Sequence, residues 1–166
     1  CYLPLLSLPL VFGTTIDTIP ARVPYLAPEP ELVRHWYRRM PQSRAFKVGL
    51  VWFGRQSLVL NRKRSCPLEI FKVLGDVSGV EFYSLQIGEG VEQLAGVTGF
   101  EIVDLTAQIT DFADTAAHIA NLDLVITIDT AVAHLAGAVG ARTWVLLPYG
   151  ADWRWLRHRN DSPWYP

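Results

Sequence analysis

A short strand that continues directly into a helix constrains this chain more than any other stretch. Residues 125–128 (Val-Ile-Thr-Ile) are a β-branched run typical of a buried strand, and Asp129 follows at once as a favourable helix N-cap. Small residues then extend the helix as far as Gly140. The first backbone N–H groups of a helix have no partner within it, and its dipoles add partial positive charge there. The junction therefore predicts a place where phosphate binds.

Each polar residue of this junction also has a purely structural interpretation. An Asp between a strand and a helix is most often only a cap, and a single His in an apolar helix is most often a hydrogen-bonded core residue. His134 is the one strongly polar side chain of this helix and lies four residues after Thr130, so the two share a face. Taken together, Asp129, Thr130 and His134 favour a ligand site.

Strands and helices alternate along most of the chain. Apolar runs predict strands at 47–52, 80–85, 100–103, 123–128 and 143–147, and periodic segments between them predict helices at 67–77, 91–95, 111–122 and 130–140. This pattern with short connections favours an α/β, Rossmann-like fold with a three-layer parallel sheet of strand order 3-2-1-4-5. The order reverses between the first and fourth strands, so a crevice is expected where their carboxyl ends meet.

Each of these strands ends in residues suited to a binding site. The first exit gives a Gly-containing loop, the second gives polar groups able to contact a base or sugar, and the fourth gives the helix N-terminus. The residues that we expect to contact a ligand are Gly54, Arg64, Gln86, Glu89, Ile109, Asp129, Thr130, Ala131 and His134.

Arg62, Lys63 and Arg64 form a basic run in the first of these loops. Such a run is usually a solvated surface, but opposite a helix N-terminus one cation would close a clamp on a diphosphate. The sequence holds no Asp-x-Asp motif, which argues against a metal-dependent sugar-nucleotide site. We therefore expect no metal and no cofactor, with the diphosphate charge met by helix N–H groups, Arg64 and His134.

Other motifs do not support a different chemistry. Gly88-x-Gly90 is too short for a dinucleotide fingerprint, and the sequence has neither a phosphate-binding P-loop nor a Gly-x-Ser-x-Gly elbow. His118 is expected on the exposed side of its helix. The formal net charge of −1 gives no reason to expect nucleic acid as a partner. Cys1 and Cys66 are too few for a disulfide framework or zinc site, which fits a cytoplasmic location.

The first 45 residues differ from the rest. Six prolines within the first 30 residues favour the last strand of a preceding domain followed by an extended linker, and 31–40 predicts a short helix. Residues 1–12 are apolar but too short to span a bilayer and lack the layout of a signal peptide, so no transmembrane segment is expected. We therefore divide the chain into 1–45 and 46–166 and expect it to be a fragment of a longer protein.

Several segments carry a family resemblance, and Asp-Thr-Ala-Val-Ala-His-Leu at 129–135 is the most specific of them. They resemble the C-terminal half of heptosyltransferase-like glycosyltransferases (glycosyltransferase family nine), above all the branch often attached to tetratricopeptide repeats. The matching segments are 47–54, 64–68, 83–86, 129–135 and 152–155. This resemblance implies a GT-B architecture, in which 46–166 is the nucleotide-sugar-binding domain and 1–45 holds the end of the N-terminal one.

The resemblance also implies roles for single residues. Thr130, Ala131 and His134 match positions that contact the donor diphosphate, and Ile109 matches a position that lines the nucleobase. Arg64 falls where heptosyltransferases carry a phosphate-binding Lys, so the charge is kept while the geometry differs. The general base of the family belongs to the N-terminal domain, and we expect this chain to lack it.

Two functions follow from these observations. The first is the donor-binding domain of a metal-independent inverting glycosyltransferase, inactive alone, with Arg64 and His134 stabilising the leaving diphosphate. Its expected partners are a nucleotide-sugar, the N-terminal catalytic domain, tetratricopeptide repeats, and a glycan or protein acceptor. The second is a noncatalytic nucleotide-sensing or docking module that keeps the fold, because fold alone does not decide function.

Overall fold

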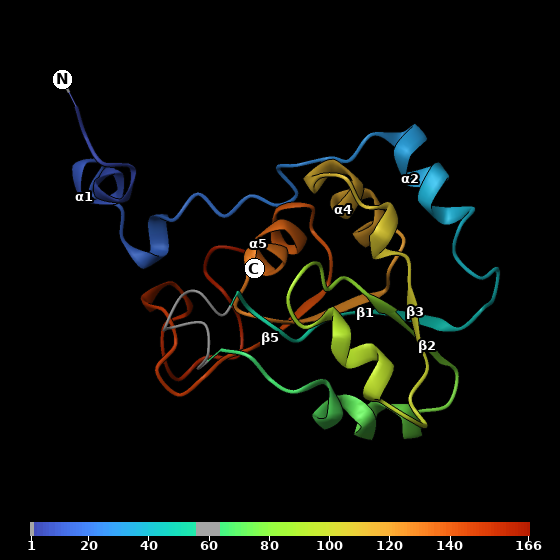
Figure 1. The fold of residues 1–166 in the computed structure, drawn as a ribbon. Helices are drawn as coiled ribbons and strands as arrows, with labels where there is room; N and C mark the ends of the chain where they lie inside the picture. The colour runs from blue at the N-terminus through green and yellow to red at the C-terminus, as the bar shows by residue number, and fades with distance from the viewer. Residues whose placement is uncertain (1, 56–63) are drawn as a thin grey trace.

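A five-stranded parallel sheet forms the centre of the molecule, with the predicted order β3-β2-β1-β4-β5. The computed structural model describes residues 2–55 and 64–166 (Figure 1). Every neighbouring pair of strands is parallel, as a Rossmann-like α/β fold requires. The strands are β1 (Phe46–Val51), β2 (Val80–Ser84), β3 (Ile102–Asp104), β4 (Leu124–Ile128) and β5 (Thr143–Leu146).

Helices cover both faces of this sheet (Figure 1). On one face, α4 (Phe112–Ile119) and α5 (Ala131–Ala138) contribute Ile119 and Ala136 to a buried cluster with Val125 of β4. On the other face lie two 3₁₀ helices, η3 (Leu68–Asp76) and η4 (Val91–Gly96). The prediction of three layers is confirmed.

The segment predicted as a helix at 67–77 is helical, but of the 3₁₀ type. Its inward-facing residues are Leu68, Phe71 and Leu74, of which Leu68 and Phe71 are buried under β1 and β2. A repeat of three residues aligns these side chains along one face of a helix with three residues per turn. The 3.6-residue turn of an α-helix would move them progressively off that face.

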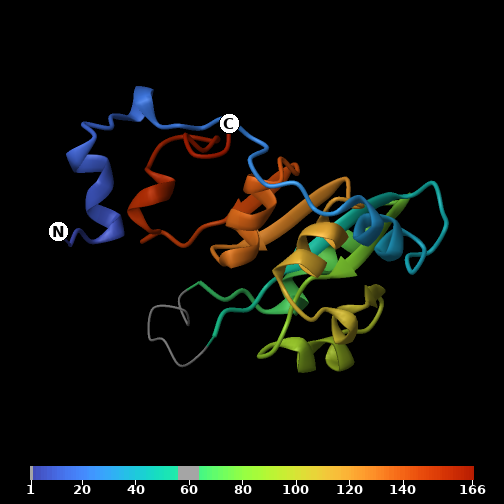
Figure 2. The same ribbon diagram turned by 90° about the horizontal axis from the view of Figure 1, so that it is seen from above.

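The prediction of a strand near the N-terminus was wrong. The segment instead forms three short helices, η1 (Leu5–Ser7), α1 (Leu8–Val11) and η2 (Ile16–Thr18). Pro9 sits in the first turn of α1, where no intrahelical N–H bond is needed, so this proline does not prevent a helical turn. Residues of this segment and of the C-terminal tail line a common pocket, and Figure 2 shows the two running side by side.

Helix α2 (Pro30–Tyr37) packs against α4 and corrects the expectation for His118. The His118 side chain is fully buried, with its ring stacked on Trp36 of α2 at 4.8 Å between centroids. The helix pattern alone placed His118 outward, but a helix some 80 residues earlier in the chain covers that face. Burial lowers the pKa of His118 from 6.5 to about 4.

Within the part of the chain that the structure describes, no helix has both the length and the apolar character needed to cross a membrane.

Candidate functional site

The junction of β4 and α5 lies at the predicted switch point, because β1 has β2 on one side and β4 on the other. The helix begins one residue later than expected. Thr130 occupies the N-cap position in an extended conformation, and Ala131 is the first helical residue. The prediction that Asp129 is the cap was therefore wrong, and its side chain is free for another contact.

Asp129 instead pairs with Arg64. The Arg64 Nη1 atom lies 3.2 Å from Asp129 Oδ2, and the Asp129 side chain is only 5% exposed while that of Arg64 is 26% exposed. A carboxylate buried to this degree needs a cationic partner, since an unpaired buried charge is costly. The ion pair places Arg64 beside the first turn of α5. A guanidinium carries five N–H donors, so one carboxylate leaves donors for a further anion.

Hydrogen bonds at the base of the loop after β1 fix where Arg64 leaves the sheet. The Gly54 backbone N–H donates to Ser65 Oγ at 3.0 Å, and the Cys66 N–H donates to the Trp52 carbonyl at 2.8 Å. These two bonds join the chain before and after the loop. Arg62 and Lys63 of the predicted basic run lie outside the described residues.

Gln86 links the exits of β1 and β2 through its side-chain amide. Its Oε1 accepts from the Trp52 and Phe53 N–H groups at 3.2 and 2.9 Å, and its Nε2 donates to the Phe53 and Glu89 carbonyls at 3.0 and 2.7 Å. Four bonds use the whole hydrogen-bonding capacity of an amide. Gln86 is also 3% exposed, so it holds the shape of these loops and has no bond left for a ligand.

The other predicted residues of these exits are more open. Glu89 is exposed on the loop that follows β2. The next residue, Gly90, has a φ of +93°, and a Cβ there would lie 2.4 Å from the Cβ of Phe53, so only glycine fits this close approach. Ile109 is half-buried after β3, at the margin of the sheet.

His134 lies on the first turns of α5 and is half-buried by the C-terminal tail. Its ring stacks on Trp155 with 5.3 Å between centroids and 14° between planes, and its Nδ1 lies 3.1 Å from Tyr165 Oη. Burial lowers the pKa of His134; the carboxylates of Asp129 and Asp152 oppose that shift and Arg154 adds to it. The imidazole is therefore mostly neutral at pH 7.

The tail residues around His134 are the part of the site that the site prediction missed. Asp152 caps η6 (Trp153–Trp155) by accepting from the Arg154 N–H at 3.1 Å, and it also pairs with the Arg154 guanidinium at 2.7 Å. Burial would raise the pKa of Asp152, but these contacts with Arg154 and the charge of Arg64 lower it. The run 152–155 carried a family resemblance, but no role had been derived for it.

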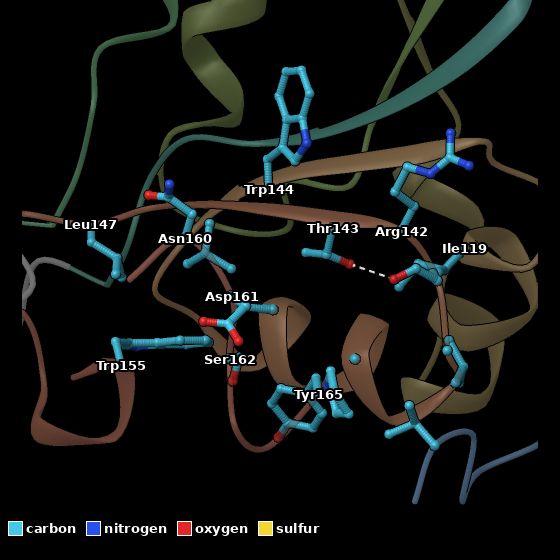
Figure 3. A pocket seen from close by; sticks show the side chains of 18 of the residues that line it. Ile119, Arg142, Thr143, Trp144, Leu147, Trp155, Asn160, Asp161, Ser162 and Tyr165 are labelled. Atoms are coloured by element: carbon cyan, nitrogen blue, oxygen red, sulfur yellow. Dashed lines mark hydrogen bonds between the residues drawn. The ribbon is translucent and has the colours of Figure 1, made fainter. Parts of the chain in front are cut away.

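A separate cavity of about 1090 Å³ opens between α5, β5 and the tail (Figure 3). Trp155 and Tyr165 form part of its wall, together with Asp161 and Ser162. None of the nine predicted ligand residues lines it. The cavity therefore adjoins the polar cluster at the start of α5 through Trp155 and Tyr165, but the predicted ligand residues lie outside it.

The structure thus brings Arg64, Asp129 and His134 to one helix N-terminus. Arg64 contacts Asp129, and Asp129 lies close enough to His134 to affect its pKa. Unpaired helix N–H groups, a guanidinium and an imidazole are a donor set suited to an anion with several oxygens. The fold and these groups together define an α/β domain with a candidate anion-binding site at its topological switch point.

Comparisons with known proteins support a glycosyltransferase-like fold. Residues 88–151 match the model of glycosyltransferase family 9 (heptosyltransferase), a range that contains β4 and the start of α5 but neither Arg64 nor the tail after residue 151. The chain is 36% identical over 165 residues to Protein FlbA of Caulobacter vibrioides, across 92% of this chain and 26% of that protein. It therefore spans about a quarter of this relative's length. No solved structure matches the chain.

Proposed function

We propose that this chain is the donor-binding part of a metal-independent, inverting glycosyltransferase of the GT-B type, related to glycosyltransferase family 9. The ion pair between Arg64 and Asp129 carries the proposal, because it holds a guanidinium beside the first turn of α5. The likeness of residues 88–151 to the family supports the class of reaction. In this proposal the ligand is a nucleotide-sugar, and its diphosphate lies over Thr130 and Ala131.

The chemistry demanded of this part is the stabilisation of charge. When a sugar leaves its nucleotide, negative charge accumulates on the diphosphate, and groups already oriented toward it lower the barrier. Arg64 keeps its positive charge at every physiological pH, and the N–H groups at the start of α5 add the helix dipole. His134, one turn along, provides a further donor. Without a metal or cofactor, these groups would meet the whole charge.

The remaining residues of the candidate site take supporting roles in the proposal. Gly54 and Gln86 shape the neighbouring loops through their hydrogen bonds, whereas Glu89 and Ile109 would contact the sugar and the base. The catalytic base would come from an N-terminal domain, so this chain alone would bind and not turn over. A glycan or protein acceptor, tetratricopeptide repeats and a cytoplasmic location complete the proposal.

One observation favours a second candidate, a noncatalytic nucleotide-sensing or docking module. Both main ligand groups already have partners inside the protein, Arg64 in Asp129 and His134 in Tyr165. Such pairing would also be found where the fold persists and catalysis has been lost. The enzyme and the nucleotide-sensing module share the same nucleotide site and differ in whether the full-length protein transfers a sugar, whereas a docking module would need no nucleotide.

Calorimetric titration of the chain with a panel of nucleoside diphosphates tests the shared site. Binding is expected with and without EDTA, and Arg64→Ala should weaken it by about tenfold or more, as loss of a charge-assisted hydrogen bond predicts. Arg44→Ala is a matched control, since Arg44 is exposed two residues before β1, at the opposite edge of the sheet. Binding that disappears in EDTA would contradict metal independence.

Failure of every nucleoside diphosphate to bind would contradict the enzyme and the nucleotide-sensing module, and would leave only the docking module. Where binding is found, assay of sugar release from nucleotide-sugars by the full-length protein separates the first two. Release that Arg64→Ala slows and Arg44→Ala leaves unchanged supports the enzyme, and binding without release supports the sensing module.

A further inference from the structure

His134 is held by two side chains from a distant part of the chain, Trp155 and Tyr165, and Tyr165 also contacts the helix that carries His134. Trp155 stacks on one face of the ring, Tyr165 Oη lies 3.1 Å from Nδ1, and the Tyr165 ring packs on Gly137, one turn further along α5. A Cβ at Gly137 would lie 2.4 Å from Tyr165 Cγ, so the absence of a side chain there is what admits the tyrosine ring. Gly137 of α5 therefore provides the space in which the Tyr165 ring lies.

The contact between Tyr165 and Nδ1 bears on which ring nitrogen of His134 carries the proton. In a neutral imidazole one nitrogen is a donor and the other an acceptor, and the hydrogen bond made by one of them fixes the role of the other. Burial keeps the pKa of His134 low, so its neutral form is the one to consider at pH 7. A hydroxyl that donates to Nδ1 leaves the proton on Nε2.

Tyr165 is suited to act as that donor. Its pKa is raised to about 12 by burial and by a hydrogen bond with Tyr25, so it keeps its proton at neutral pH. Tyr25 is itself anchored at the end of α5, because the backbone N–H groups of Tyr25 and Leu26 donate to the Ala138 carbonyl. Tyr165 has a single proton to donate, and His134 Nδ1 competes for it with the Tyr25 hydroxyl.

Three other charged groups act on His134, two from the tail and one from the strand exit. Asp152 and Arg154 belong to the turn of η6, and Asp129 precedes α5. Asp152 already pairs with Arg154, and Asp129 with Arg64. These paired charges leave Tyr165 as the hydrogen-bond partner of the ring among the described residues.

We propose that Tyr165 is a positioning residue that holds His134 in its Nε2–H tautomer, so that the imidazole presents a neutral donor to the diphosphate. This inference rests on the proposed function for the identity of the ligand, and on the contact between Tyr165 Oη and His134 Nδ1, with Tyr165 as the donor, for the tautomer. It also makes the tail around Tyr165 and Trp155 (Figure 3) part of the binding site, although residues 152–166 lie outside the family match.

Nitrogen-15 spectroscopy of the labelled chain, at a pH above the histidine range and with EDTA present, tests the tautomer directly. The His134 signals, assigned by their loss in His134→Gln, should show a protonated Nε2 and an unprotonated, hydrogen-bonded Nδ1. Tyr165→Phe should shift the Nδ1 signal as that hydrogen bond is lost. Tyr149→Phe is the matched control, because Tyr149 is 99% exposed and should leave both signals unchanged.

Titration with inorganic pyrophosphate then tests the consequence for binding. Tyr165→Phe should weaken the affinity about twofold to tenfold, the range that corresponds to the net value of one hydrogen bond, and Tyr149→Phe should not. A wild-type spectrum with the proton on Nδ1 would overturn the inference, as would a Tyr165→Phe spectrum identical to wild type. If Tyr165→Phe does not fold, the wild-type spectrum by itself tests the His134 tautomer.

The tautomer assignment and the proposed function can fail separately. A wild-type chain that shows the Nε2–H tautomer but binds neither pyrophosphate nor a nucleoside diphosphate would overturn the proposed function and leave the tautomer assignment standing. A chain that binds these ligands with the proton on Nδ1 would do the reverse.

Discussion

Two histidines of this molecule stack on tryptophans and serve different ends. His118 lies on Trp36 with 4.8 Å between centroids and 9° between planes, and His134 lies on Trp155 with 5.3 Å and 14°. Burial lowers the pKa of both imidazoles. The stacking geometry of the two pairs is therefore nearly the same.

Their polar surroundings differ. Neither ring nitrogen of His118 has a hydrogen-bond partner in the described part of the chain, and its side chain is fully buried. His134 is only half-buried, with a hydroxyl at one nitrogen and charged groups nearby. The first pair is therefore a packing contact that fastens α2 to α4, and the second orients a ring whose other nitrogen remains for a ligand. Polar partners, and not stacking on a tryptophan ring, therefore distinguish a candidate binding histidine from a structural one.

The largest effect expected is the loss of the α2 contact. Trp36→Ala removes a side chain that is 1% exposed, together with its stack on His118 and its N–H bond to Asp114 at 3.2 Å. We expect the free energy of unfolding to fall by about 3–5 kcal/mol. Urea denaturation measures it, with Trp153→Ala as control because Trp153 is 57% exposed. Equal losses in the two variants would show that α2 is not fastened through Trp36.

A slightly smaller effect should appear in the pH dependence of stability. The pKa of His118 falls from 6.5 to about 4 on folding, so between these values the unfolded chain binds more protons. The free energy of unfolding should therefore decrease as the pH falls through this window, by about 3 kcal/mol, and stay level above it. His118→Phe should remove most of this slope, while His134→Phe should remove less. Denaturation curves at several pH values would contradict the assignment if the two variants behave alike.

Arg64 provides the next test, because it belongs to the candidate ligand site that contains His134. If its guanidinium faces a diphosphate, raising the salt concentration should weaken pyrophosphate binding by the wild-type chain, because the charges are partly exposed. Arg64→Ala should bind less tightly, by about tenfold, and depend less on salt. Titrations at low and high salt measure both quantities. An unchanged salt dependence in Arg64→Ala, with Arg44→Ala alongside, would place the anion elsewhere.

The sheet could be predicted because its information is local. Apolar runs such as Val125–Ile128 mark strands wherever they lie, and the chirality of crossovers then limits the possible orders. The same locality gave the position of the α5 N-terminus to within one residue. Even the 3₁₀ character of η3 is visible in hindsight, in the three-residue repeat of Leu68, Phe71 and Leu74.

What escaped prediction depends on contacts between distant segments. The prediction that His118 is exposed considered only its own helix, but α2 covers that face. Arg64 was predicted to bind the diphosphate from its place in the loop after β1 and from the resemblance, while its pairing with Asp129 has no signature in the sequence. Tyr165 belongs to an irregular tail without periodicity, so no pattern could assign it to His134. Packing between elements decides burial and pairing, and one sequence carries few signs of it.

The smallest effect expected is the pH dependence of binding, which separates the two histidines most directly. A protonated His134 would bind a diphosphate more tightly than the neutral donor, so affinity should rise as the pH falls. Because burial lowers the pKa of His134, this rise should lie mainly below pH 6.5, and should amount to a few-fold. His134→Ala should flatten the curve, whereas His118→Phe should leave it intact, since no ligand can reach a fully buried ring. Pyrophosphate titrations between pH 5 and 8 measure this, and a curve that only His118→Phe flattens would reverse the two assignments.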